Sequence, residues 1–192
     1  MSNQTRQKIL AKTSDLLERQ GYHATGLNQI VKESSTPRGS IYYYFPDGKE
    51  ELAVEAVSQR MDQMATFARH ALNQKEDAVE AIVSFIELVA ANMVKSNCCT
   101  GAPIAAVALE TSNISEPIRN ACAVGYQKLQ DVFSAKLVMG GFTTDDAHSL
   151  ASTLNSSFEG AMIMCRTRQD AEPLYHMAQN MRILLECVSE RS

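Results

Sequence analysis

Residues 21–45 read GYHATGLNQIVKESSTPRGSIYYYF, and they contain the clearest structural pattern in the chain. Apolar side chains recur at helical spacing over 27–34, and the tetrapeptide Ser-Ser-Thr-Pro then breaks the chain. Thr36 is placed to cap the next helix, and Pro37 to occupy its first position. We therefore predict two short helices joined by a tight turn and packed on a longer first helix, which is the form of a helix-turn-helix.

The second short helix, which is expected to end near Phe45, is the element that enters the major groove of DNA in such a motif. Ile41 and Phe45 lie four residues apart and are expected to face the core. The side chains expected to point outward, where they can bind phosphates or base edges, are Arg38, Ser40, Tyr42 and Tyr43. In the alternative interpretation the three adjacent tyrosines simply pack, but three adjacent residues of one helix cannot all face one core.

The rest of the chain predicts longer helices and an all-α fold. A first helix over Thr5–Gln20 is expected to end at Gly21, the residue type suited to a left-handed C-terminal cap. The helical segments lengthen after Gly48, so we expect an N-terminal helix-turn-helix domain at 1–48 and a C-terminal helical domain at 49–192. The helices expected in the second domain are Lys49–Leu72, Glu76–Lys95, Pro103–Thr111, Glu116–Val138, Thr144–Arg168 and Ala171–Glu190.

Charge is distributed unevenly along the chain. The net charge is −4, but residues 1–49 carry seven basic and four acidic groups, a local charge of +3, which leaves −7 for the remainder. DNA binding depends on neutralising phosphates, so this asymmetry favours a DNA-reading N-terminal domain. No apolar stretch approaches the roughly 20 residues of a membrane span, and residues 1–7 lack a signal-peptide pattern, so a cytoplasmic location is expected.

The reactive residue types predict neither a metal centre nor a cofactor. The five cysteines and four histidines lack the spacing of a zinc site. Cys98 and Cys99 lie in a polar segment where a thiol could react, with inert cysteine as the alternative. A helical enzyme that uses Glu110 or Asp131 with a cysteine is a competing hypothesis, but no catalytic motif supports it.

Three segments carry a resemblance to a known family. They are Gly21 to Val31, Pro37 to Phe45, and Lys49 to Leu52, and in this order and spacing they resemble the N-terminal signature of TetR-family transcriptional regulators. The run 28–33, the Pro-Asp-Gly-Lys junction at 46–49 and the segment 105–110 are similar to the LmrA/YxaF-like subgroup.

The resemblance implies which residues contact DNA. It places Thr25, Tyr42 and Lys49 at phosphates, and Arg38, Gly39, Ser40 and Tyr43 at the bases or the adjoining backbone. Ser35 departs from the glycine that is usual in this turn, and we expect it at a positive φ that a non-glycine residue adopts less readily.

The resemblance also implies that the second domain contains a ligand cavity and a dimer interface. Candidate ligand-binding residues are Met64, Phe67, Phe85, Val89, Met93, Tyr126, Phe133, Phe158 and Met162, and the alternative is that each fills an ordinary core, where such side chains most often lie. The apolar faces of the last two helices are expected to pair with a second copy, the alternative being a hairpin that packs only on its own domain.

These observations predict a homodimeric, ligand-responsive repressor that leaves a palindromic operator when a small hydrophobic effector binds. The alternative function is a helical small-molecule-binding protein without a DNA-reading role. The two are distinguished by duplex binding that weakens steeply with added salt.

Overall fold

The protein is helical throughout the part that the computed structural model describes, residues 3–96 and 104–190. The described residues form nine helices and no strand, as the hydrophobic periodicity predicts. The helices are α1 (Asn3–Ala24), α2 (Leu27–Ser34), α3 (Arg38–Tyr44), α4 (Lys49–Leu72), α5 (Ala78–Lys95), α6 (Ala105–Thr111), α7 (Glu116–Met139), α8 (Thr144–Arg168) and α9 (Glu172–Ser189).

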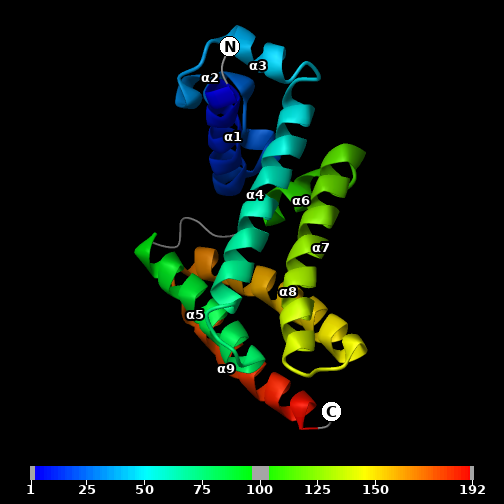
Figure 1. Ribbon diagram of the computed structural model, residues 1–192. Coiled ribbons are helices and arrows are strands. Elements are labelled where there is room, and N and C mark those ends of the chain that lie inside the picture. Colours follow the sequence, from blue (N-terminus) through cyan, green and yellow to red (C-terminus); the bar gives the residue numbers. More distant parts are fainter. Residues whose placement is uncertain (1–2, 97–103, 191–192) are drawn as a thin grey trace. The chain divides into compact units, whose positions relative to one another are not determined.

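The predicted helix-turn-helix is present. Helices α1, α2 and α3 pack against one another (Figure 1), and Ile30, Ile41 and Phe45 are buried in their core. Ser35 joins α2 to α3 in the left-handed conformation, with φ 52° and ψ 40°, so the expected positive φ is confirmed.

Two details of this motif differ from the prediction. Gly21 interrupts the first helix, as expected, but it takes φ 78° with an extended ψ of −176° rather than the left-handed cap conformation, and a further short helical segment carries α1 on to Ala24. Thr36 does not cap α3, which starts at Arg38 after an extended Pro37. The Thr36 hydroxyl is instead hydrogen-bonded to the Ser34 hydroxyl at 2.7 Å, and both side chains are buried.

Helix ends in the rest of the chain follow local capping chemistry. Thr143 accepts a hydrogen bond from the backbone N–H of Asp146, and Ser115 accepts one from Ile118. Helix α7 ends before Gly140 and Gly141, and Gly141 has φ 95°. The predicted helix starts at Glu116 and Thr144 are confirmed, and the end expected at Val138 lies one residue before the observed end at Met139.

The chain divides into two compact units. The first contains residues 1–61 and 102–125, and the second contains residues 62–101 and 126–192. In the first unit α6 packs on α1, and in the second α9 packs on both α5 and α8 (Figure 1). The domain boundary expected after residue 48 stays a prediction, since the first packing unit also takes in α6 and parts of α4 and α7. In the described ranges, no helix combines the length and apolar character needed to cross a membrane.

Candidate nucleic-acid interface

Helix α3 presents an exposed polar and aromatic surface. Tyr42 is 48% exposed and Tyr43 is 66% exposed, while Arg38 and Gly39 at the start of the helix are also exposed. A Cβ added to Gly39 would meet nothing within 4 Å. The prediction that at least one of the three tyrosines faces solvent is therefore confirmed, and this surface is open to a large partner.

Ser40 and Thr25 lie differently from the sequence-based expectation. The outward orientation predicted for Ser40 is wrong: its side chain is 2% exposed, because it lies beside Ile41 on the inner side of α3. Thr25 is fully buried, and its hydroxyl donates a hydrogen bond of 2.7 Å to the backbone oxygen of Gly21. In this structure Thr25 thus closes the turn before α2, and a phosphate contact through its hydroxyl would require that bond to be given up.

Lys49 connects the start of α4 to the end of α1. Its ammonium group donates to the backbone oxygen of Tyr22 at 2.7 Å and lies 4.1 Å from the centre of the Tyr22 ring. Partial burial lowers the pKa of Lys49, while the negative charge of Glu110 acts in the opposite direction. An ammonium group has three N–H donors, and the bond to Tyr22 uses only one of them. Lys49 can therefore still donate to a phosphate, and that contact stays a prediction.

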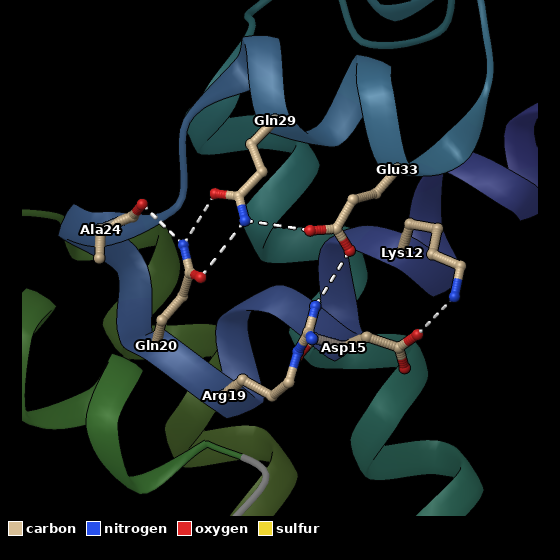
Figure 2. Close-up of polar contacts among 7 residues, drawn as sticks. All are labelled: Lys12, Asp15, Arg19, Gln20, Ala24, Gln29 and Glu33. Atoms are coloured by element: carbon tan, nitrogen blue, oxygen red, sulfur yellow. Dashed lines mark hydrogen bonds and ion pairs between the residues drawn. The ribbon is translucent and has the colours of Figure 1, made fainter.

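A network of polar side chains fastens α2 onto α1 (Figure 2). Gln29 exchanges hydrogen bonds with Gln20 and donates to Glu33 at 3.0 Å, and Glu33 pairs with Arg19 at 3.0 Å. Exposed pairs of this kind contribute about 0.2–1 kcal/mol each. The network therefore supplements the apolar packing of α2 on α1, in which Ile30 is fully buried.

Glu110 of α6 contacts the junction between α1 and α2, which sequence reasoning did not predict. Its carboxylate accepts a 2.7 Å hydrogen bond from the backbone N–H of His23 and packs against the Cα of Gly21. The sequence contains no signal for this contact, because the two residues joined by the hydrogen bond are 87 positions apart. Glu110 therefore binds the backbone of the helix-turn-helix at the junction of α1 and α2. This contact is structural, in contrast to the catalytic role considered for Glu110 from the sequence.

The second unit brings four of the predicted ligand-binding residues together. The Phe85 ring lies 6.1 Å from Phe67, 5.5 Å from Phe133 and 5.8 Å from Phe158, measured between ring centres. The pair Phe85 and Phe158 is stacked, with an interplanar angle of 26°. We refer to these four side chains as the phenylalanine cluster.

The other predicted ligand-binding residues lie near the ends of this cluster or in the core. Val89 and Met93 are buried about one and two turns beyond Phe85 on α5, and Met162 is buried one turn beyond Phe158 on α8. Met64 on α4 is half-buried. These positions fit both a ligand site and an ordinary core, so the ligand-binding role stays a prediction.

Tyr126, the remaining predicted ligand-binding residue, belongs to a polar group that sequence reasoning missed. The Nδ2 atom of Asn155 donates to the backbone oxygen of Tyr126 at 3.2 Å, and the Tyr126 hydroxyl is hydrogen-bonded to the carboxylate of Glu159. Burial raises the pKa of Glu159 to about 7, although this hydrogen bond acts to lower it. The sequence signal that could have identified this polar group is that Asn155 and Glu159 lie on the same side of α8 as the buried Phe158.

We expect the substitution Glu159→Gln to stabilise the protein in a pH-dependent way. In the unfolded chain the carboxyl titrates near 4.5, and in the folded protein near 7. Between pH 4.5 and pH 7 the folded protein therefore binds a proton that the unfolded chain does not. The free energy of unfolding falls as the pH rises through this range. Glutamine does not titrate, so the variant should gain up to about 3 kcal/mol over the wild type between pH 5 and pH 8, measured by chemical denaturation.

The exposed carboxylate Glu87 on α5 provides the matched control. Glu87→Gln should show the same pH dependence of unfolding as the wild type. If Glu159→Gln also keeps that dependence unchanged, the buried carboxyl does not control stability in this range.

Metal-ligating and thiol groups do not gather at either site. Across residues 3–96 and 104–190 there is no group of three or more His, Cys, Asp or Glu side chains suited to a metal ion. Cys122 and Cys165 are buried, and burial raises the pKa of Cys122 to about 11, which disfavours a reactive thiolate there. The candidate reactive thiols Cys98 and Cys99 lie outside the described residues.

Comparison with known proteins defines the class to which this arrangement belongs. Residues 9–56 match the model of the tetR family of bacterial regulatory proteins, and residues 78–180 match that of the C-terminal domain of LmrA/YxaF-like transcriptional regulators. The fold agrees: the regulatory protein TetR from Rhodobacter sphaeroides superposes with a TM-score of 0.83 over 93% of this chain and 97% of that one, at 17% identity. The chain therefore belongs to the tetR family of helix-turn-helix transcriptional regulators, with an LmrA/YxaF-like C-terminal domain.

Two regulators of Bacillus subtilis are similar over almost the full length. The HTH-type regulator YxaF is 40% identical over 181 residues, covering 94% of this chain and 95% of that protein. The HTH-type regulator LmrA is 35% identical over 182 residues, covering 95% and 97%. The matched families and relatives are transcriptional regulators and not enzymes, which decides against the enzyme hypothesis.

Proposed function

We propose that this protein is a repressor that binds a palindromic operator as a homodimer and releases it when a small hydrophobic effector binds. The observation that carries the proposal is the exposed surface of α3, formed by Arg38, Gly39, Tyr42 and Tyr43, within a helix-turn-helix of the tetR family. The Arg38 guanidinium can donate two hydrogen bonds to a guanine or a phosphate. Tyrosine hydroxyls can bind phosphate oxygens while the rings lie against sugars, and Gly39 permits close approach of the backbone.

The exposed apolar surface of α8 and α9 supports the homodimer. Five large side chains on these helices are between 37% and 65% exposed, namely Ile163, Met164, Tyr175, Ile183 and Leu184. Both helices also line a hollow of about 620 Å³ that includes Gly160 and Met177. An apolar surface of this extent is typical of an interaction site, and a two-fold dimer would present two recognition helices to an inverted repeat.

We expect the substitution Gly160→Arg to convert the dimer to a monomer. A Cβ at Gly160 would meet nothing within 4 Å in a single protomer, so the fold should tolerate the change. In a packed dimer interface the same side chain would be buried without a partner, and the dimer dissociation constant should rise at least about a hundredfold. Analytical ultracentrifugation measures this constant.

The exposed position Gln63 on α4 offers a control of the same chemistry. Gln63→Arg should leave the dimer unchanged. A Gly160→Arg protein that remains dimeric would show that α8 does not form the interface at this position.

The effector would act by preferring one of two states. It must bind the DNA-incompetent arrangement of the recognition helices more tightly than the competent one, because equal affinity for both shifts nothing. The phenylalanine cluster is the proposed apolar part of its site. Helix α4, which is continuous from Lys49 to Leu72, is the proposed transmitter.

The test is selection of bound duplexes from a random-sequence DNA pool with the purified protein. We expect an inverted repeat, bound with an affinity that falls steeply as salt is added. Such an activity belongs in the cytoplasm, where bacterial DNA lies. Recovery of no motif, together with no duplex binding at low salt, would instead favour a small-molecule-binding protein without a DNA-reading role.

A further inference from the structure

Two acceptor oxygens on α8 are buried without a hydrogen-bond partner among the described residues. They are Oδ1 of Asn155 and Oε2 of Glu159. Asn155 is 8% exposed. Buried polar atoms are nearly always paired, and an unpaired one costs free energy, so two such atoms one helical turn apart require an explanation.

Tyr126 of the neighbouring helix α7 fixes the positions of the Asn155 and Glu159 side chains. The Asn155 amide donates to the backbone oxygen of Tyr126, and the Tyr126 hydroxyl binds the Glu159 carboxylate. Each side chain is therefore fixed by one hydrogen bond, while Oδ1 of Asn155 and Oε2 of Glu159 can still accept a hydrogen bond. In the part of the chain that the structure covers, the ion pairs all use acidic groups other than Glu159.

The same face of α8 leads from these two oxygens into the phenylalanine cluster. Asn155, Phe158 and Glu159 are spaced at i, i+3 and i+4, which places them on one side of the helix. Phe158 stacks on Phe85, and Phe85 also contacts Phe133. Acceptors and aromatic rings therefore adjoin one another inside the second unit.

We propose that Asn155 and Glu159 form the polar end of the effector site, and that the effector joins an aromatic body to a cationic nitrogen such as a protonated amine. The inference rests on the proposed function, which it deepens by naming the class of effector. A protonated primary amine has three N–H donors and no acceptor, so it can bond both free oxygens at once. Its charge also compensates a carboxylate whose pKa burial has raised to about 7.

Two probes that share one aromatic body test the proposal. The probes are 1-naphthylmethylamine, which is cationic at neutral pH, and 1-naphthylmethanol, which is neutral and nearly isosteric. Calorimetric titration of the full-length protein at pH 7.5 should show at least about tenfold tighter binding of the amine, the size of effect expected for a desolvated charge pair. Glu159→Gln should abolish this preference while changing the affinity for the alcohol less than about threefold.

The control variant Glu87→Gln should keep the full preference for the amine, because Glu87 is exposed on α5. Equal affinity for the two probes would overturn the proposal and indicate that water satisfies the two oxygens. A preference that survives in Glu159→Gln would also overturn it, as would failure of both probes to bind.

A gel-shift assay with the operator recovered by selection separates this inference from the proposed function. Glu159-dependent amine binding that leaves the DNA complex intact would support the site and contradict ligand-controlled repression. Release of the operator by 1-naphthylmethanol at the same concentration as by the amine, in both wild type and Glu159→Gln, would support ligand-controlled repression and overturn the proposed cationic class.

Discussion

Replacement of Arg38 or Tyr43 by alanine is expected to lower operator affinity about ten- to a hundredfold in each case, a loss of about 1–3 kcal/mol. Both side chains are exposed on α3, and neither contributes to the buried core beneath it. Removing them should therefore leave thermal unfolding almost unchanged. The measurement is a gel-shift titration against the selected operator at fixed salt concentration.

The sequence selectivity and salt dependence of Arg38→Ala should show whether Arg38 binds a base or a phosphate. Arg38→Ala is expected to relax selectivity at one base pair if the guanidinium reads a guanine, or to weaken all sequences equally and reduce the salt dependence if it binds a phosphate. Arg69→Ala, which removes an exposed arginine from α4 in the second unit, is the matched control and should bind DNA as the wild type does. Unchanged binding by both Arg38→Ala and Tyr43→Ala would remove α3 as the reading surface.

Gly21→Ala is expected to destabilise the protein by about 3 kcal/mol or more. Gly21 has φ 78° and ψ −176°, a region that is essentially closed to other residues and costs about 1–3 kcal/mol for alanine. The new Cβ would also lie 2.8 Å from the carboxyl carbon of Glu110, so the Glu110 side chain would have to move away from the backbone N–H of His23. Chemical denaturation measures the loss.

A double variant separates backbone strain from the overlap with Glu110. Glu110→Ala alone should cost about 1 kcal/mol, because the His23 N–H loses its partner. In the Gly21→Ala protein, Glu110→Ala should lower the free energy of unfolding by less than this, or even raise it, because it removes the overlap with the new Cβ. Strictly additive effects of the two substitutions would show that the two residues do not interact. Gly39→Ala, at an exposed helical position with free space around its Cα, should instead raise stability by about 0.5–1 kcal/mol.

The helix-turn-helix was predictable from sequence because its determinants are local. Its apolar spacing and the break before Pro37 each depend on residues a few positions apart. The starts of α7 and α8 are local in the same way, because hydroxyl groups of Ser115 and Thr143 cap them. The exposed tyrosines of α3 follow from the same reasoning. Ser40 was misplaced because a short helix turns by 100° per residue, and its inner side includes a small polar residue that sequence alone assigns to the surface.

The candidate effector site was only partly predictable. Four phenylalanines were expected in it, and their rings do meet. Asn155 and Glu159 were missed, because polarity in a sequence usually marks a solvent-facing position. Their burial is a property of how α7 packs on α8 beside Tyr126, and the chain separation of 29 residues leaves no local trace of that contact.

The order of the helices, most of their ends, the helix-turn-helix and the family could be predicted from the sequence alone, because these depend on backbone hydrogen bonding and side-chain patterns within short segments. The capping of α3 is an exception, since it starts at Arg38 without a side-chain cap. The tertiary structure decided which side chains act together. Glu110 lies on Gly21, Lys49 lies on Tyr22, and Glu159 lies beside Tyr126, because packing brings together groups that are distant along the chain. Burial then changes their chemistry, by removing water from a carboxylate and leaving its oxygen for another donor.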